Sequence, residues 1–273
     1  MKRLITICAV VGILLTASAN VKAAVVDPCL YLQFDGLDGA TTTVDSSPHL
    51  HPITLLGTPA PQAQLDTAFK PVPPVGNVSS LLLDGSNDYA TSPDSADWDI
   101  VASNADNWTV DFYVRLDTHA GTTGLMGQGS DSSNRWAIRN VHNSGLTFLV
   151  RVGTSEVINT GFGGEITDSD WHWIALCKVG PEYAIYKDGN QVNYTNDTST
   201  ANFTGLLNIG RTYGPSYYYT DGNMDEVRIW HANVFDAAPN SGKTDTIANI
   251  PEPATICLLG LGALSLLRRK RSV

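Results

Sequence analysis

The sequence predicts an all-β protein, a sandwich or jelly roll made of many short strands. Its clearest strand is Trp108–Leu116 (WTVDFYVRL), in which alternate positions are apolar from Trp108 onward. Strict alternation with a period of two is typical of a half-buried strand. Similar short runs recur between clusters of Gly, Asn, Asp and Pro, and no segment keeps a helical period over three turns. This pattern favours a packed pair of sheets.

Eight further segments carry the same β-branched and aromatic signature. Asp188-Gly189 follows one of them, and this pair predicts a type I′ hairpin because both residues tolerate positive φ. Residues 57–77 are rich in proline and predict an irregular crossing loop. The eight predicted strands are Leu30–Phe34, Leu81–Leu83, Arg135–Arg139, Leu146–Val152, Trp171–Val179, Tyr183–Lys187, Leu206–Ile209 and Met224–Trp230.

The N-terminus has the layout of a secretory signal peptide, residues 1–23. Lys2 and Arg3 precede an apolar run that ends at Ala17, and Val21-Lys22-Ala23 offers a cleavage site before Ala24. An uncleaved membrane anchor is the alternative, but the apolar run is shorter than the roughly 20 residues of a spanning helix. We expect an apolar helix here and another at the C-terminal end.

Charge is distributed unevenly along the chain. Of 17 Lys and Arg, seven lie in the two end segments, whereas of 27 Asp and Glu only Glu252 does, so the part between them has a formal charge of −16. Such a surface repels phosphate backbones, which argues against a nucleic-acid partner. This part retains Cys29 and Cys177. An oxidising compartment permits a disulfide between them, but their predicted positions leave the pairing open.

Five segments in order resemble the laminin-G-like branch of the concanavalin A-like lectin/glucanase superfamily. They are SSLLLDGSNDYATSP (79–93), WTVDFYVRL, WHWIALCKVGPEYAIYKDGNQV, LLNIGR and GNMDEVRIW. The resemblance covers most of residues 30–230. It implies a two-sheet antiparallel jelly roll with the first and last strands side by side. It does not imply one function, because this fold carries lectins, adhesive modules, enzymes and spacers.

The C-terminal tail, residues 251–273, resembles a PEP-CTERM sorting signal. Pro251, Glu252 and Pro253 precede an apolar run of 14 residues, and a basic end follows at Arg268, Arg269, Lys270 and Arg271. The resemblance implies recognition by an exosortase in the inner membrane of a Gram-negative bacterium. The basic end fits the positive-inside rule for a short transmembrane segment. The alternatives are an ordinary tail anchor or a buried core helix.

Catalytic motifs are absent from the sequence. Glucanases of this superfamily place two Glu and an Asp on one strand, whereas the four Glu between residues 24 and 250 do not form that pattern. Asp225 and Glu226 are adjacent, and neighbouring strand residues face opposite sides. The histidines are scattered, and each is interpreted as a surface or turn residue: His49, His51, His119, His142, His172 and His231. We therefore expect no enzymatic activity.

A structural Ca²⁺ is the metal hypothesis that the sequence supports. The resemblance places Asp35, at the end of the first strand, beside Asp225 on the last, and Asp45 is a third candidate. Carboxylates with backbone carbonyls form the oxygen cage that calcium prefers. Alternatively, Asp35 and Asp45 cap turns and Asp225 pairs with an arginine.

A tyrosine-rich loop is the candidate ligand site. Tyr213, Tyr217 and Tyr219 lie close in sequence around Gly214 and Pro215, and aromatic faces on loops suit stacking against sugar rings. The alternative is alternation along a strand, with Tyr218 packing inward and its neighbours merely on the surface.

The domains expected are therefore a signal peptide (1–23), a laminin-G-like jelly roll (24–236), a small, polar linker (237–250) and the sorting tail (251–273). We expect a non-catalytic protein of the cell surface or extracellular matrix that binds carbohydrate or matrix. Its partners would be the export machinery, the exosortase and polysaccharide, with the inner membrane occupied transiently. A polysaccharide-acting enzyme and a structural spacer are the alternatives.

Overall fold

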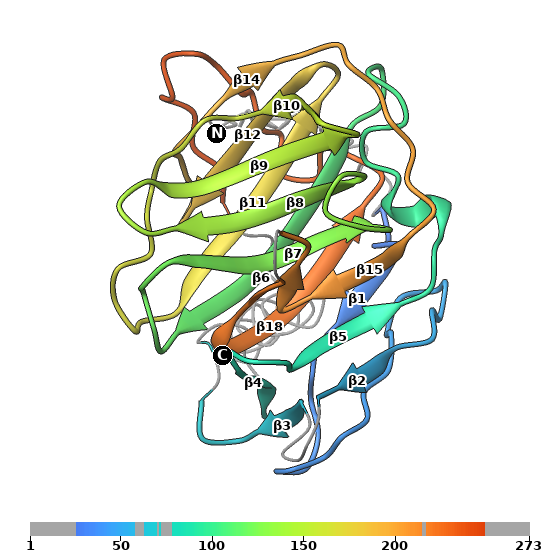
Figure 1. The fold of residues 1–273 in the computed structure, drawn as a ribbon, viewed down its shortest axis with the longest axis vertical. Coiled ribbons are helices and arrows are strands. Elements are labelled where there is room, and N and C mark those ends of the chain that lie inside the picture. Colours follow the sequence, from blue (N-terminus) through green and yellow to red (C-terminus); the bar gives the residue numbers. More distant parts are fainter. Residues whose placement is uncertain (1–25, 58–62, 70, 72–77, 215–216, 249–273) are drawn as a thin grey trace, which may run out of the picture.

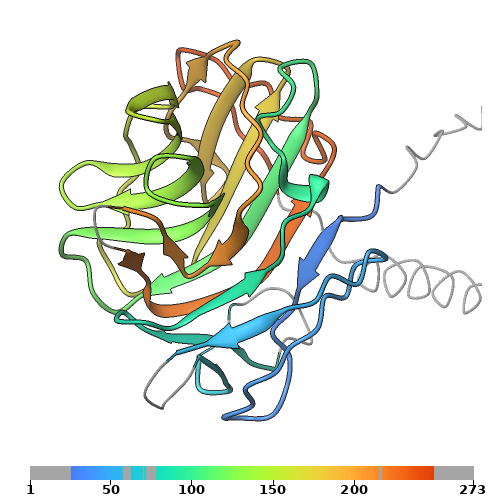
Figure 2. The same ribbon diagram turned by 45° about the vertical axis from the view of Figure 1, so that its right-hand side comes forward.

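The computed structural model describes residues 26–57, 63–69, 71, 78–214 and 217–248. Two antiparallel sheets lie face to face in a jelly roll, and the layers separate clearly in Figure 2. The seven-stranded sheet, nearer the viewer in Figure 1, has the order β10 (Ser155–Asn159), β9 (Gly145–Val152), β8 (Arg135–Val141), β7 (Thr122–Gly129), β15 (Leu206–Ile209), β5 (Tyr89–Ser92) and β2 (Thr54–Leu56).

The nine-stranded sheet lies behind it. Its order is β13 (Asn190–Gln191), β12 (Glu182–Lys187), β11 (His172–Val179), β6 (Trp108–Leu116), β18 (Asp221–Trp230), β4 (Ser80–Asp84) and β3 (Gln64–Asp66), with β1 (Leu30–Leu32) on β18 and β14 (Thr195–Asn196) on β12. Two short strands form a separate pair, β16 (Arg211–Thr212) with β17 (Tyr218–Tyr219). The remaining described element is a 3₁₀ turn, η1 (Ala96–Trp98).

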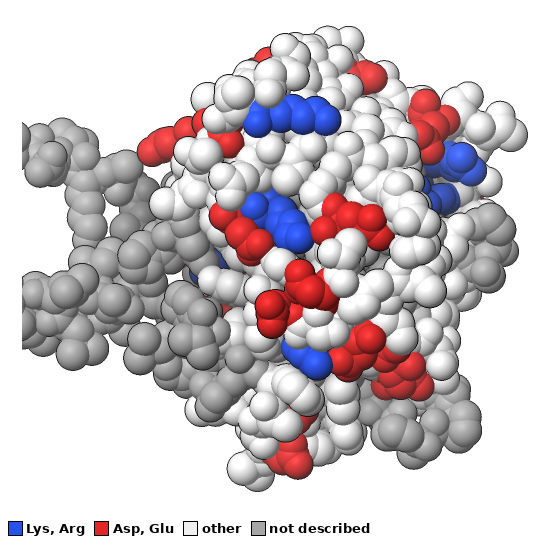
Figure 3. Space-filling model, turned by 90° about the vertical axis from the view of Figure 1, so that its left-hand side faces the viewer, with Lys and Arg blue, Asp and Glu red and all other residues white. Residues whose placement is uncertain are grey.

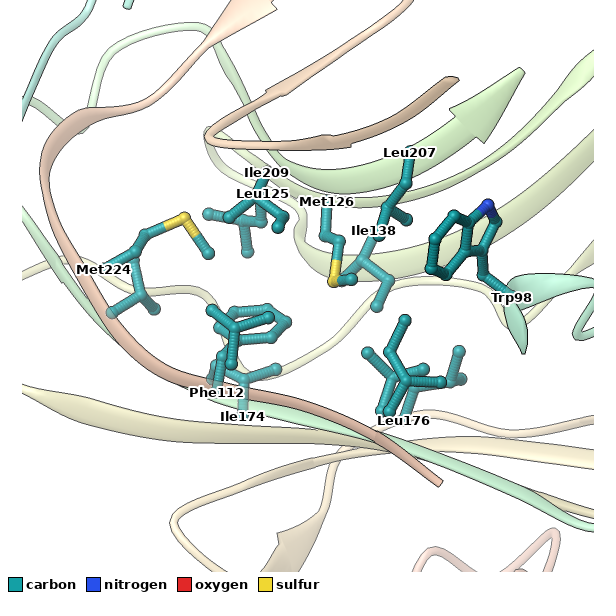
Figure 4. Packing of buried hydrophobic residues seen from close by; sticks show 14 of the residues in the cluster. Trp98, Phe112, Leu125, Met126, Ile138, Ile174, Leu176, Leu207, Ile209 and Met224 are labelled. Carbon is teal, nitrogen blue, oxygen red and sulfur yellow. The ribbon is translucent and has the colours of Figure 1, made fainter. Parts of the chain in front are cut away.

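The main core fills the space between the sheets. Alternate residues of each strand point inward, as Trp136 and Ile138 of β8 and Phe112 of β6 do, and all three are fully buried. Figure 4 shows the side chains of the seven-stranded sheet, among them Leu125, Met126 and Ile138, facing those of the nine-stranded sheet, among them Phe112, Ile174 and Leu176. Burying apolar surface at about 25 cal/mol per Å² is the main force that holds the layers together.

The first and last strands lie side by side, as the resemblance implies. Leu30 pairs with Ile229 and Leu32 with Val227 in an antiparallel register. β18 carries a bulge at Glu226, whose φ is +51°, and its register with β6 shifts there. The bulge turns β18 from pairing with β4 at one end to pairing with β1 at the other.

Each strand expected from the sequence corresponds to an observed strand, with ends that differ by up to three residues. The hairpin prediction is confirmed: Asp188 and Gly189 have φ values of +52° and +82° between β12 and β13. This combination of positive φ values is that of a type I′ turn.

A second apolar cluster covers the outer face of the nine-stranded sheet. Trp173 and Tyr186 of this sheet pack beneath Phe235, Ala237 and Ile247, which follow β18 in the chain. The segment expected as a linker over 237–250 is thus packed along residues 237–248. Its backbone at Ile247 donates to the carbonyl of Gly189, and the carboxylate of Asp245 accepts from the hydroxyl of Tyr186 at 2.6 Å.

A buried ion pair lies at the edge of this second cluster. Asp111 of β6 has no exposed surface and accepts from Arg228 of β18, its cross-strand partner, through Nε at 3.1 Å and Nη2 at 2.5 Å. The indole nitrogens of Trp173 and Trp230 also donate to its carboxylate, each at 3.1 Å. Burial acts to lower the pKa of Arg228, but the charge of Asp111 and the hydrogen bonds to it outweigh burial and raise that pKa. Arg228 therefore keeps its positive charge in this buried position.

Both cysteines of the described part are buried and free. Cys29 donates to two backbone carbonyls, while Cys177 lies in the second cluster. Burial raises the pKa of both thiols, which makes them poor nucleophiles. On the side of the molecule shown in Figure 3, acidic and basic side chains are interspersed and do not form one continuous acidic patch.

His172 sits between two carboxylates where β11 begins. Its Nδ1 lies 2.7 Å from Asp188 and its Nε2 lies 2.9 Å from Asp168. The bond to Asp188 is the largest influence and raises the pKa of His172, although burial opposes this. The hydrogen bond with His172 lowers the pKa of Asp168. Burial acts to raise the pKa of Asp188, but hydrogen bonds with His172 and the backbone of Trp173 outweigh it and lower that pKa.

This arrangement predicts a pH-dependent stability. Because the folded pKa of His172 is raised, its contribution is complete below about pH 6.5 and is lost as the pH rises through the folded value. The carboxylates act in the opposite sense, and their contribution is lost as the pH falls below about 4. The melting temperature should fall between pH 6 and pH 9, and His172→Asn should flatten that fall. His142→Asn, at an exposed histidine, should leave the fall unchanged; an equal fall in the His172 variant would contradict the assignment.

The predicted signal peptide, residues 1–23, and the sorting tail, residues 251–273, lie outside the described residues, as do the apolar helices expected there. Within the described ranges, no helix has the length and hydropathy needed to cross a membrane.

Candidate functional site

The predicted tyrosine cluster forms around an arginine that the sequence did not indicate. Arg211 of β16 lies with its guanidinium carbon 3.4 Å from the ring centre of Tyr89 and 4.5 Å from that of Tyr217. The ring of Tyr213 is 5.8 Å from the same carbon and 5.2 Å from the ring of Tyr217, which in turn lies 6.0 Å from Tyr219. The three candidate residues are thus brought together, with Tyr89 of β5 as a fourth.

The β16–β17 pair carries this cluster over the seven-stranded sheet. The sheet makes room for it with a glycine of β7: a Cβ at Gly124 would lie 2.4 Å from the carbonyl oxygen of Tyr218 and 2.5 Å from the backbone nitrogen of Thr212. Tyr218 does not pack into the core but lies over Arg139, with its ring centre 5.8 Å from the guanidinium carbon. The hairpin therefore joins the tyrosines to the outer face of β8.

Three arginines stand on that outer face. Arg135 and Arg139 are four residues apart on β8 and so share a face, opposite to that of the core residues Trp136 and Ile138. Arg151 of β9 is the direct cross-strand partner of Arg135. Like charges in that position destabilise a sheet. Burial, followed by the charges of Arg139 and Arg151, lowers the pKa of Arg135 to about 10.

Several buried guanidinium nitrogens of these three arginines have no hydrogen-bond acceptor. Arg135 is 3% exposed, yet its Nε and Nη1 make no hydrogen bond, and the Nε atoms of Arg139 and Arg151 are also buried without a partner. The nearest carboxylate, Glu156 of β10, lies 3.8 Å from Arg151. Guanidinium groups bind carboxylates or phosphates through paired hydrogen bonds. The face therefore offers donors for an anion beside aromatic rings that suit stacking, and we name these eight residues the Arg–Tyr face: Tyr89, Arg135, Arg139, Arg151, Arg211, Tyr213, Tyr217 and Tyr219.

The family can now be stated. Residues 84–237, more than half of the chain, match the family model described as the concanavalin A-like lectin/glucanases superfamily. The chain belongs to this superfamily. Residues 249–271 match the PEP-CTERM protein-sorting motif, which marks proteins for export. No curated protein matches the chain.

Solved structures confirm the superfamily fold at low sequence identity. The chain is similar to the binding domain of botulinum neurotoxin DC in complex with SialylT (15% identity, TM-score 0.53, covering 75% of this chain and 48% of that one). The same domain in complex with rat synaptotagmin II gives 16% identity and a TM-score of 0.53 over 75% and 48%. A structure of botulinum neurotoxin type C, whose cell entry depends on interaction with two ganglioside molecules, gives 15% identity and a TM-score of 0.52 over 74% of this chain and 47% of that one. The chain thus spans about half the length of these proteins.

The three acidic residues proposed for calcium have different hydrogen-bond partners. Asp35 is exposed and accepts from the backbone of Val78 at 2.8 Å, whereas Asp225 is fully buried and accepts from the backbone of Glu226 at 2.9 Å. Asp45 accepts four hydrogen bonds from the backbone or side chain of Tyr31, Ser47 and His51. Among the described residues, two groups of three His, Cys, Asp or Glu side chains bring their ligand atoms within 4.8 Å of one another, and neither group contains one of these three aspartates.

The four glutamates of this part of the chain have different partners. Glu156 is on β10, Glu165 accepts from the backbone of Asn143, Glu182 accepts from Tyr194, and Glu226 accepts from Tyr31. Each thus belongs to a different local contact.

Proposed function

We propose that this domain binds an anionic carbohydrate on its Arg–Tyr face and does not cleave it. The observation that supports this most strongly is the three-arginine row with unused buried donors beside four tyrosines. Clustered like charges and unpaired buried donors both reduce stability, and such costs are typical of ligand sites. A uronate or another acidic sugar would supply carboxylates to the arginines and ring faces to the tyrosines.

The chemistry of the face fits an acidic sugar better than a neutral one. A hydrogen bond to a charged group contributes about 1.5–3 kcal/mol, and aromatic stacking about 0.5–1.5 kcal/mol. The carboxylates of the ligand would also relieve the repulsion between Arg135 and Arg151. One of the similar structures is a binding domain in complex with SialylT, and another belongs to a toxin whose cell entry depends on two ganglioside molecules; both support a carbohydrate ligand.

The sorting motif indicates where in or around the cell this binding would take place. We propose that the protein is exported from a Gram-negative bacterium, held briefly in the inner membrane, processed by an exosortase, and released to the cell surface or extracellular matrix. Polysaccharides accumulate in that location, and the domain would attach there by non-covalent binding. Ile247 packs on the domain and the motif begins at Pro251, so little chain separates the two.

Affinity electrophoresis against acidic and neutral polysaccharides tests the binding proposal. The protein should be retarded by a polyuronate, and Tyr217→Ala should weaken the retardation about three- to tenfold because it removes one stacking face. Tyr194→Ala is the matched control, since Tyr194 is a partly exposed tyrosine bonded to Glu182 on the other sheet. Retardation that is unaffected by Tyr217→Ala, or reduced equally by both substitutions, would contradict the assigned face.

A further inference from the structure

Three histidines converge on one carboxylate at the end of the sandwich where η1 lies. His49 Nδ1 is 2.5 Å and His51 Nε2 is 2.8 Å from Oδ2 of Asp97, while His231 Nε2 is 3.6 Å from Oδ1. Asp97 belongs to η1, His231 directly follows β18, and the other two lie in the loop after β1. These histidines, which the sequence analysis treats as unrelated surface or turn residues, thus form one group with the aspartate. We call His49, His51, Asp97 and His231 the Asp97 cluster.

The loop that carries two of the histidines is held in place by a buried aspartate. Asp45, 4% exposed, accepts from the backbone nitrogens of Tyr31, Ser47 and His51, each at 2.8–2.9 Å. Leu50 between the histidines has a φ of +54° and an exposed side chain, an unfavourable combination for a leucine. This strained turn directs both neighbouring imidazoles toward the same carboxylate.

Two indoles fix the imidazoles in place. The ring of His51 lies 4.7 Å from that of Trp98, and the ring of His231 lies 3.9 Å from that of Trp108. Both tryptophans are buried. His231 and Trp108 also line an open hollow of about 700 Å³, so solutes can reach the cluster from one side. The imidazoles are therefore positioned by core residues while their nitrogens remain accessible.

We propose that the Asp97 cluster binds a transition-metal ion, Zn²⁺ in particular, through His49, His51 and Asp97, with His231 or water as the fourth ligand. The ligand atoms of His49, His51 and Asp97 lie within 4.8 Å of one another, and a second group joins Asp97 to His231 and Cys29. Two imidazole nitrogens with a carboxylate oxygen are a common zinc ligand set. Calcium prefers oxygen ligands and would bind this cluster poorly.

Binding requires only a small opening of the cluster. Tetrahedral zinc with bonds of about 2.0–2.1 Å separates its ligand atoms by about 3.3 Å. The ring nitrogens of His49 and His51 would therefore move outward from Asp97 by less than about 1 Å. His49 is 45% exposed on its loop and has room for that movement. The hydrogen bonds to Asp45 would keep the loop in place while the imidazoles turn.

Metal titration of the purified full chain tests this proposal. Zn²⁺ at a hundredfold excess over its dissociation constant should raise the melting temperature by about 5–10 °C, and Ca²⁺ should not. Co²⁺ should give the visible absorption of a tetrahedral site. Asp97→Asn and His51→Ala should each weaken zinc binding at least tenfold. His142→Ala is the matched control, because His142 is 48% exposed and outside the cluster.

The outcomes separate the metal from a cluster held by hydrogen bonds alone. No zinc in the protein after equilibration and no zinc-dependent melting shift would overturn the proposal. Equal loss of binding in the His142 variant would also overturn it by showing surface binding. If Asp97→Asn fails to fold, His49→Ala, at an exposed loop position, still distinguishes a metal site from a cluster held by hydrogen bonds alone. Unchanged zinc binding in the His49 variant would contradict the metal site. A melting shift with calcium alone would instead support the calcium site expected from the sequence.

Discussion

Replacing Asp111 with alanine should lower the free energy of unfolding by about 3–5 kcal/mol, the range measured when one member of a buried ion pair is removed. Its carboxylate has no exposed surface and accepts from Arg228 and from two indoles. The substitution removes the charge that compensates Arg228 across β6 and β18 at the centre of the nine-stranded sheet. It also leaves the indole nitrogens of Trp173 and Trp230 without this acceptor.

Urea unfolding followed by tryptophan fluorescence measures this loss. Asp117→Ala is the matched control, because Asp117 is 43% exposed and pairs with Arg115 at the surface. Surface pairs contribute about 0–1 kcal/mol, so this control should unfold near the native midpoint. A loss below about 1 kcal/mol for Asp111→Ala, or equal losses in the two variants, would show that the buried pair does not stabilise the sheet.

Ending the chain at Asp236 in place of Ile250 should also destabilise the domain strongly, by about 2–4 kcal/mol. The deletion removes Ile247 and Ala237 from the second cluster and uncovers Trp173 and Tyr186. Burial of one isoleucine contributes about 1.5–3 kcal/mol, and the bond from Tyr186 to Asp245 about 1 more, offset in part by the ordering of the segment. The uncovered apolar face should also promote aggregation.

Thermal unfolding of the two chain lengths, with light scattering, measures both effects. Within the longer chain, Ile247→Ala should reproduce part of the loss, whereas Lys243→Ala, at an exposed position of the same segment, should not. Equal melting temperatures for the chains ending at 236 and 250 would mean that residues 237–248 act only as a linker, as the sequence alone predicts.

The fold could be predicted because its strands follow simple alternation. Trp108–Leu116 and the Asp188-Gly189 turn carry local signals, and the structure agrees with both. β7 was missed because its sequence, TTGLMGQG, is rich in glycine, which is depleted in strands. Gly124 is explained only by tertiary structure, since the backbones of β16 and β17 lie against it.

The candidate sites were predictable only in part. The tyrosines of 213–219 are close in sequence, so their cluster could be anticipated, whereas Arg211 becomes its centre only after the hairpin folds over the sheet. Arg135 and Arg139 share a strand face by their spacing, a signal the alternation could have revealed. The Asp97 cluster could not be anticipated beyond the spacing of His49 and His51, because Asp97 and His231 reach it through the fold.

The most direct test of carbohydrate binding is calorimetric titration with an oligouronate of four to six units and with the same oligosaccharide after its carboxylates are reduced to alcohols. We predict that the oligouronate binds and that the reduced form binds at least tenfold more weakly. Arg139→Ala should weaken oligouronate binding about 10–100-fold, as the loss of a charged hydrogen bond implies, while Lys243→Ala should not. Equal affinity for the two oligosaccharides, or full affinity in the Arg139 variant, would contradict the assignment of the Arg–Tyr face.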